Sequence, residues 1–242
     1  MNIIRLEKTD STNTWASQHE SELDLPALVY CHDQTSGRGQ RGNKWESEPG
    51  KNITASLIFH PEEFPASNQF LISEAIALSI VGFLKGKGVE AKVKWPNDIY
   101  VGDKKICGIL VEHVVLGRNI VRTIAGFGIN INQKHFVSDA PNPVSLTSIT
   151  GLEYKLEEAI DNLAGYLKSF LKVSPSDIYI HQCFLENLWR FDNQFYPFFD
   201  RKTNEKIKAK ISRVNAEGIM TLELENGSER KYAFKEVEFI LQ

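Results

Sequence analysis

Cysteine is scarce in this chain of 242 residues, which carries three, at positions 31, 107 and 183. Their number is odd, their spacing is wide, and no C-x-x-C pair occurs. This pattern excludes a disulfide framework and a zinc site built from paired thiolates. We expect Cys31, Cys107 and Cys183 to be reduced, buried thiols of a cytoplasmic protein.

Excess positive charge and a membrane-spanning run are also missing. The formal net charge is −3 and the pI is near 6.1, whereas a general nucleic-acid binder is normally basic. Residues 1–10 are too charged for a signal peptide. The most apolar run, residues 70–84, is too short to cross a bilayer and contains Glu74. We therefore expect no DNA partner and no membrane partner.

What the chain does contain is a regular pattern of strands and helices. Its length and 42% hydrophobic content predict one large domain, with or without a small one. Hydrophobic periodicity predicts strands at 3–6, 28–31, 52–59, 91–95, 99–101, 105–115 and 119–132, and helices at 15–23, 67–87, 156–173 and 176–191. The helix at 67–87 is apolar nearly all round and should be buried. After residue 197, short strands at 206–212, 218–225, 230–234 and 237–241 predict a small β-barrel or sheet. We place the domain boundary between residues 195 and 196.

Residues 37–45 form the most informative segment, GRGQRGNKW. Glycines let backbone N–H groups approach a ligand, and Arg38, Arg41 and Lys44 supply donors for phosphate or carboxylate oxygens. Trp45 offers a flat face for a base. The flanks fit neither a Walker A loop nor a Rossmann fingerprint. A plain surface turn and a contact with a nucleic-acid backbone remain open as alternatives.

Two further segments place polar groups at strand ends. Residues 94–98, KWPND, put a cation, an amide and a carboxylate beside a proline, although an ordinary turn has the same composition. Two-residue alternation predicts that Lys105 shares a strand face with Cys107, Ile109 and Val111. Lys105 then either extends from the strand end into solvent or contributes its charge to a ligand-binding site. Gly108 in mid-strand favours close approach of a ligand.

Other polar residues have simple structural explanations. Ser11-Thr12-Asn13 is typical of a helix N-cap. The segment 126–132, GFGININ, fits a turn or a set of amides that reach a base or ribose. His19, His60 and His113 have no metal-ligand spacing, so we expect them to be structural.

The order of these segments resembles the bacterial biotin–protein ligase family. The resemblance covers roughly residues 5–135, and its most specific parts are GRGQRGNKW and KWPND-x₆-K-x-x-G-I-L-V-E. Residues 198–242 resemble the small C-terminal β domain of that family. The resemblance implies an α+β fold, with a mixed sheet flanked by helices as in class II aminoacyl-tRNA synthetases and lipoate ligases. It also implies ATP-dependent activation of biotin to biotinyl-5′-AMP and transfer to a lysine of a biotin carboxyl carrier protein domain.

The same resemblance implies roles for individual residues. Lys105 and Arg38 would be catalytic, with Mg²⁺ brought by the ATP phosphates and no protein metal cage. Biotin would contact Ser11, Thr12, Asn13, Gln34, Gly37, Arg38, Gly39, Lys105, Gly108 and Leu110. The nucleotide would contact Arg38, Gln40, Arg41, Trp45, Lys94, Asn97, Asp98 and Asn130.

Two departures from the family pattern affect the expected function. Many members begin with a DNA-binding winged helix, whereas Ser11-Thr12-Asn13 comes almost at once here, so we expect a monofunctional ligase. Many members also have arginine where Gln40 stands, and that arginine is associated with retention of the adenylate. We therefore expect weaker retention here unless Arg41 takes over that role. Alternatives are a lipoate or octanoate transferase of the same fold and, from other classes, a nucleic-acid-binding module or a scaffold. A homodimer is possible in this family.

Overall fold

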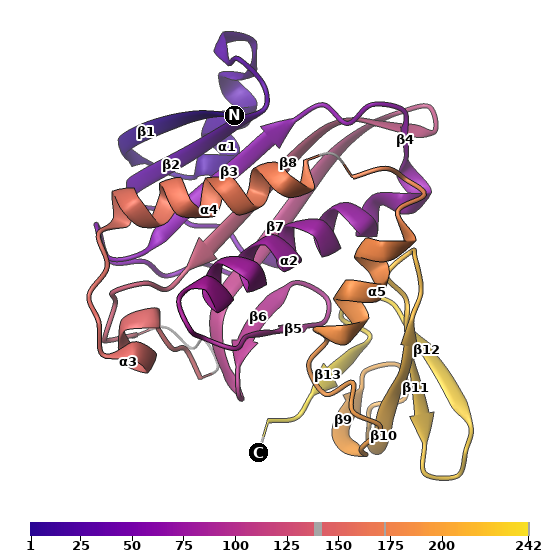
Figure 1. Cartoon of the computed structure of the whole chain (residues 1–242). Coiled ribbons are helices and arrows are strands. Elements are labelled where there is room, and N and C mark those ends of the chain that lie inside the picture. The colour runs from indigo at the N-terminus through magenta and orange to yellow at the C-terminus, as the bar shows by residue number, and fades with distance from the viewer. Residues whose placement is uncertain (138–141, 172, 242) are drawn as a thin grey trace.

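The computed structural model describes residues 1–137, 142–171 and 173–241, without the side chains of Arg41 and Phe170. A large sheet forms the centre, two long helices cross one of its faces, and a second sheet lies at the end that holds the C-terminus (Figure 1). The expected α+β fold with a mixed, helix-flanked sheet is confirmed.

The large sheet has the strand order β1-β2-β3-β8-β7-β6-β5, with β4 added beside β8. Only the β1–β2 pair is parallel, so the sheet is mixed. Its strands are β1 (Asn2–Thr9), β2 (Ala27–Gln34), β3 (Ile53–Phe59), β4 (Phe64–Pro65), β5 (Lys92–Lys94), β6 (Asp98–Val101), β7 (Lys104–Leu116) and β8 (Asn119–Ile129). All seven predicted strands are present, and only the two-residue β4 was missed.

The helices divide between the two faces of this sheet. The long helices α2 and α4 cover one face (Figure 1), while α1 packs on the other against Val29, Ile58 and Ile124. Beyond α1, a cavity lies on this second face. The helices are α1 (Thr12–Gln18), α2 (Gln69–Gly86), α3 (Leu146–Thr150), α4 (Leu156–Phe170) and α5 (Ile178–Glu186), and 3₁₀ turns lie at Glu20–Glu22, Gln40–Gly42 and Ala66–Asn68.

Helix α2 is buried on nearly all sides, as its apolar sequence predicts. Together with the preceding turn it spans Ala66–Gly86, which is long and apolar enough to cross a membrane by length and composition. The expectation that this run is too short is therefore wrong. In this fold 72% of its apolar window is buried, as in a core helix.

The second sheet has the order β12-β11-β10-β9-β13 and is antiparallel throughout. Its strands are β9 (Tyr196–Asp200), β10 (Glu205–Val214), β11 (Met220–Leu224), β12 (Glu229–Tyr232) and β13 (Val237–Phe239). Among the described residues no ladder joins β12 to β13, so of the two predicted forms, barrel or sheet, the structure has the open sheet. The domain boundary at residues 195 and 196 stays a prediction.

The two sheets are joined through an aromatic cluster. Trp95 is 2% exposed, and its Nε1 donates to the Gly218 carbonyl at 3.0 Å. The ring of Phe234 lies 5.4 Å from that of Trp95 and 5.9 Å from that of Phe70 on α2. This packing brings β13 close to the KWPND segment.

A candidate ligand cavity at the open face of the sheet

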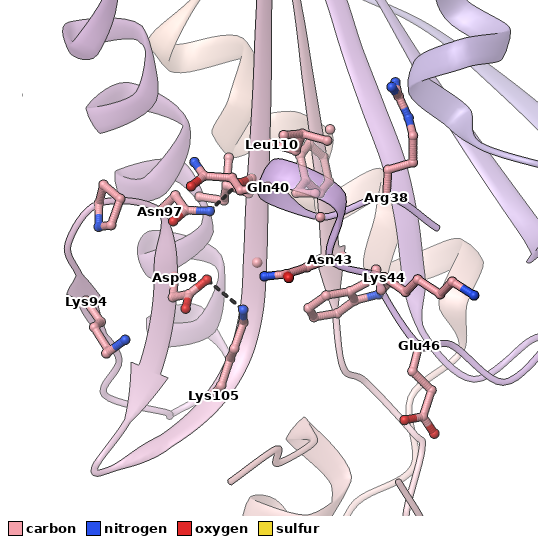
Figure 2. Close-up of a pocket in the computed structure, with 18 of the residues that line it drawn as sticks. Arg38, Gln40, Asn43, Lys44, Glu46, Lys94, Asn97, Asp98, Lys105 and Leu110 are labelled. Atoms are coloured by element: carbon pink, nitrogen blue, oxygen red, sulfur yellow. Dashed lines mark hydrogen bonds and ion pairs between the residues drawn. The ribbon is translucent and has the colours of Figure 1, made fainter. Parts of the chain in front are cut away.

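A cavity of about 1,140 Å³ lies on the sheet face that α2 and α4 leave uncovered (Figure 2). It is lined by every predicted site residue except Gly37 and Arg41, and the side chain of Arg41 lies outside the described part of the structure. The predicted lining residues are Ser11, Thr12, Asn13, Gln34, Arg38, Gly39, Gln40, Trp45, Lys94, Asn97, Asp98, Lys105, Gly108, Leu110 and Asn130. Segments far apart in the sequence therefore meet around one space.

Lys105 reaches this cavity because the β6–β7 ladder contains a bulge. Tyr100 pairs with Lys105 and Ile99 pairs with Cys107, so Ile106 is an extra residue on β7. The predicted face shared with Cys107 is therefore wrong, and Lys105 lies on the side of Gly108 instead. Its Nζ is 2.7 Å from Asp98 Oδ1 (Figure 2), and it would lie 3.3 Å from a Cβ at Gly108.

A buried polar cluster occupies one end of the cavity. Ser11 occupies the N-cap position of α1 as predicted, but its side chain makes no capping hydrogen bond and lines the cavity. The Thr12 amide and hydroxyl donate to Gln34 Oε1 at 2.9 and 3.2 Å. The Ser56 hydroxyl lies 2.7 Å from Thr12 Oγ1 and 2.6 Å from Asn13 Oδ1. These groups are held in place by one another, not by solvent.

The glycine-rich segment folds back on itself as a tight loop. Arg38 and Lys44 form an isolated antiparallel bridge. The Gly39 amide donates to the Asn43 carbonyl at 2.7 Å, and the Trp45 amide donates to the Gly37 carbonyl at 2.9 Å. A Cβ at Gly37 would lie 2.6 Å from the Trp45 carbonyl oxygen, closer than real side chains allow, so this position requires glycine.

The indole of Trp45 lies directly on two glycines of the sheet. A Cβ at Gly128 on β8 would overlap the indole, and one at Gly108 on β7 would be 3.0 Å from it. The Lys105 Nζ is 5.6 Å from the ring centroid. The Trp45 Nε1 is buried and has no hydrogen-bond partner among the described residues. The missing side chains of Gly108 and Gly128 thus create a flat seat for this ring.

Lys94 lies at the junction of the cavity with the second sheet. Its Nζ is 5.0 Å from the Tyr100 ring and 5.1 Å from the Phe239 ring, so it has a cation–π contact from each sheet. Burial lowers the pKa of Lys94 because the charged form loses hydration, and the nearby Asp98 carboxylate opposes this shift.

Asn97 and Asn130 are fixed by main-chain carbonyls. Asn97 Nδ2 donates to Ile109 O at 2.6 Å, and Asn130 Nδ2 donates to Val144 O at 3.1 Å. The Oδ1 of Asn130 is buried and, in the described part of the chain, accepts no hydrogen bond. An unpaired buried acceptor is costly, and this oxygen is therefore available to a ligand donor.

Several residues in or next to the cavity were not predicted from the sequence; Ser56 and Glu112 lie outside its lining and hydrogen-bond to residues that form it. Ser56 is a polar residue within the apolar strand β3, and this contrast could have marked it as a site residue. Glu112 stands within the KxxGILVE motif but was given no role. Arg201, Lys235, Glu238 and Phe239 come from the second sheet and carry no motif. The Lys235 Nζ donates to the Gln40 carbonyl at 3.4 Å, which links the second sheet to the glycine-rich loop.

The cavity is locally positive on a chain that is acidic overall. Six cationic side chains line it (Arg38, Lys44, Lys94, Lys105, Arg201 and Lys235), against three carboxylates (Glu46, Asp98 and Glu238). Asp98 and Glu238 are paired with Lys105 and Arg201. Such a cavity attracts an anionic ligand. Within the described ranges no group of three or more His, Cys, Asp and Glu side chains is arranged to hold a metal ion.

The residues expected to be structural have local partners. The Nδ1 of His19 and the Nδ1 of His113 lie 3.0 and 2.9 Å from Trp15 O and Thr123 Oγ1, and His60 pairs with Glu20. All three cysteines are free; Cys31 and Cys107 are buried as predicted, whereas Cys183 on α5 is half-buried.

Residues 5–130 match the biotin/lipoate A/B protein ligase family. The chain belongs to this family. It is 32% identical over 165 residues to the biotin–[acetyl-CoA-carboxylase] ligase of Paracoccus denitrificans, which covers 66% of this chain and 68% of that protein. It is 33% identical over 142 residues to the bifunctional ligase/repressor BirA of Salmonella typhimurium.

This match covers 58% of the chain but only 44% of the Salmonella protein. The chain therefore matches less than half the length of that relative. Among solved structures, the biotin protein ligase of Aquifex aeolicus in complex with biotin and ATP superposes with a TM-score of 0.80. That alignment covers 100% of this chain and 99% of the other at 24% identity, and it establishes a shared fold over both sheets. The predicted family is confirmed.

Proposed function

We propose that this family member activates biotin with ATP to biotinyl-5′-AMP and transfers the biotin to a lysine of a carrier protein. One observation carries the proposal: Arg38 and Lys105 line the same cavity as the buried polar cluster around Thr12 and Gln34. A single space thus offers hydrogen-bond partners for a polar ring system at one end and cations for a carboxylate and phosphates beyond it.

The polar cluster favours biotin over lipoate. Ser11, Thr12 and Asn13 are 3 to 4% exposed and Ser56 is fully buried. The ureido ring of biotin has two N–H donors and a carbonyl acceptor that satisfy such groups. A dithiolane ring has neither and can form no such hydrogen bond with the cluster. A site built around hydrogen bonds rejects a ligand that lacks them by up to about 10⁴–10⁵-fold.

The groups beyond this cluster suit a nucleotide. Trp45 offers its ring to adenine, and the free Oδ1 of Asn130 accepts a hydrogen bond from the base or ribose. Lys94, Asn97 and Asp98 line the same cavity and are proposed to lie near the phosphates. Gln40 contributes its backbone, which Lys235 already contacts.

In the first half-reaction the biotin carboxylate attacks the α-phosphorus of ATP and pyrophosphate leaves. Two anions must approach each other, so the site needs fixed positive charge where negative charge develops. Lys105 supplies it, held by Asp98 at 2.7 Å, and Arg38 adds a second cation from the loop. Mg²⁺, which ATP would bring on its phosphates, would neutralise further charge there.

In the second half-reaction the acceptor lysine attacks the mixed anhydride and AMP leaves. A free lysine has a pKa near 10.4, so about one in 2,500 is neutral at pH 7. The cationic cavity depresses that pKa and raises the reactive fraction. The tight loop of residues 37–45 excludes water from the anhydride and must open to admit the acceptor.

The acceptor is a biotin carboxyl carrier domain; a homodimer and a cytoplasmic location stay predictions.

Biotin-dependent exchange of pyrophosphate into ATP tests the proposal, because only the first half-reaction produces it. We expect exchange with biotin, no exchange without it, and no competition by lipoate. Exchange supported by lipoate and not by biotin would assign the cavity to the other branch of the family. Absence of exchange with either acid would contradict the proposed function.

A further inference from the structure

Glu112 lies on β7 beside the cavity, and the proposed chemistry does not use it. Its Oε2 accepts a hydrogen bond from Arg38 Nη2 at 2.9 Å and another from Asn13 Nδ2 at 2.7 Å. One carboxylate oxygen therefore connects the cation of the glycine-rich loop to a buried amide of α1.

The two partners of Glu112 are held to different degrees. Asn13 is 4% exposed, its Nδ2 lies 3.4 Å from Leu110 O, and its Oδ1 lies 2.6 Å from the Ser56 hydroxyl. A Cβ at Gly126 would overlap its side chain, so the sheet is shaped around Asn13. The Arg38 side chain is 46% exposed, and Glu112 is its only ion-pair partner among the described residues. Asn13 thus fixes Glu112, and Glu112 alone fixes Arg38.

The ion pair turns Arg38 away from the reacting groups. In Figure 2 the Arg38 side chain extends away from Lys105 and Asp98, which form an ion pair with each other. A carboxylate or phosphate bound near Lys105 must therefore draw the guanidinium from Glu112. Ion pairs between half-exposed groups contribute little net stability, so this exchange costs little.

We infer that Glu112 is a positioning residue that holds Arg38 aside in the empty cavity and releases it to the anionic group of the ligand. The inference rests on the proposed function, which supplies that anion. Glu112 then competes with the ligand for Arg38 and weakens anion binding. A carboxylate that only supported Asn13 would instead strengthen ligand binding.

The substitution Glu112→Gln separates these two roles. Glutamine has the same shape and keeps an oxygen for Asn13, but it loses the charge that pairs with Arg38. We expect the α,β-methylene analogue of ATP to bind about two- to fivefold more tightly in the presence of biotin, a size typical of an exposed ion pair. In an Arg38→Met background the same substitution should leave that affinity unchanged.

A second readout requires no ligand. Trypsin should cleave after Arg38 at least threefold faster in ligand-free Glu112→Gln than in the wild type, because the loop has lost its ion pair. Glu158→Gln, which removes an exposed carboxylate that pairs with Lys155 on α4, is the matched control and should change neither readout.

Unchanged or weaker nucleotide affinity in Glu112→Gln would overturn the inference, and so would unchanged cleavage after Arg38. If Glu112→Gln does not fold, Glu112→Asp shortens the reach to Arg38 by one methylene and should shift both readouts in the same direction. A wild-type protein without pyrophosphate exchange would contradict the proposed function instead, and the trypsin comparison would still test the Glu112–Arg38 contact.

Discussion

Among single residues, Lys105 shows how one extra residue in a strand decides where a side chain lies. Strict alternation directs its side chain to the face of Cys107, whose thiol is fully buried in the core. The bulge at Ile106 moves Lys105 to the other face, where Asp98 holds its ammonium in the cavity. A bulge is set by the register of the partner strand, which the sequence of β7 does not contain.

We expect Lys105→Met to reduce biotin-dependent exchange by about 10²–10³-fold, as loss of one oxyanion donor does elsewhere. The fold should persist, because methionine fills the same space. Exchange assays and thermal melting measure the two effects. Lys155→Met, at the residue just before α4, where the side chain is 81% exposed, is the control. Exchange within threefold of wild type would remove Lys105 from the catalytic role.

The seat of Trp45 leads to a second expectation. In Gly128→Ala the new Cβ would overlap the indole, so the ring must leave the sheet. We expect a shift of tryptophan emission in the ligand-free protein and a several-fold higher KM for ATP. Gly165→Ala on α4 places its Cβ in open space and serves as control. The same emission shift in a Trp45→Phe background would show that another tryptophan produces it.

Gln40 concerns retention of the intermediate. A neutral side chain here offers no charge to the adenylate phosphate, so we expect the wild type to release biotinyl-5′-AMP faster than a Gln40→Arg variant. Rapid filtration of the protein with radiolabelled adenylate measures the release rates. Equal rates would show that another cation of the cavity, such as Lys235, already retains the intermediate.

Among the elements, α2 and α5 are joined by a pair that should make stability depend on pH. Glu74 is 1% exposed, and His181 Nδ1 lies 2.7 Å from its Oε1. Burial raises the pKa of Glu74, and the hydrogen bond with Glu74 raises the pKa of His181. Both shifts make the folded protein bind more protons than the unfolded chain. The difference begins near pH 4.5, the ordinary glutamate pKa, and extends above pH 6.5, the ordinary histidine pKa.

Because the folded state holds these protons more strongly, the contribution of the pair should decrease as the pH rises through that window. We expect the free energy of unfolding to fall by on the order of 1 kcal/mol between pH 5 and 8 from this pair. The double variant Glu74→Gln/His181→Gln should flatten the dependence, whereas His135→Gln, at an exposed histidine, should not. Melting curves with identical pH slopes in all three proteins would contradict this account.

The elements themselves were largely predictable because their causes are local. Apolar periodicity located the core strands and α2, and the Gly102-Asp103 turn located the β6–β7 hairpin. Strand β9 was missed because it contains Pro197, and proline is unusual inside a strand. Helix α3 was missed because it has five residues, and its stability depends on Ser145 accepting a hydrogen bond from the Ser148 amide.

For the whole molecule, the sequence predicted the site better than it predicted the site's surroundings. Arg38, Lys105 and the Thr12 cluster belong to motifs, and the structure brings them to one cavity. Ser56 and Glu112 complete the hydrogen-bond network from neighbouring strands, and Lys235 arrives from the second sheet. These contacts depend on how strands pair and sheets pack, which are long-range properties that no local pattern contains.

The account depends on one cavity that holds biotin and the nucleotide at the same time. Calorimetric titration of biotin, with and without the α,β-methylene analogue of ATP, tests this most directly. We predict one biotin site per chain and a higher affinity when the analogue is present, because the two ligands share Arg38 and Lys105. No binding of biotin, or an affinity that the analogue leaves unchanged, would contradict the account.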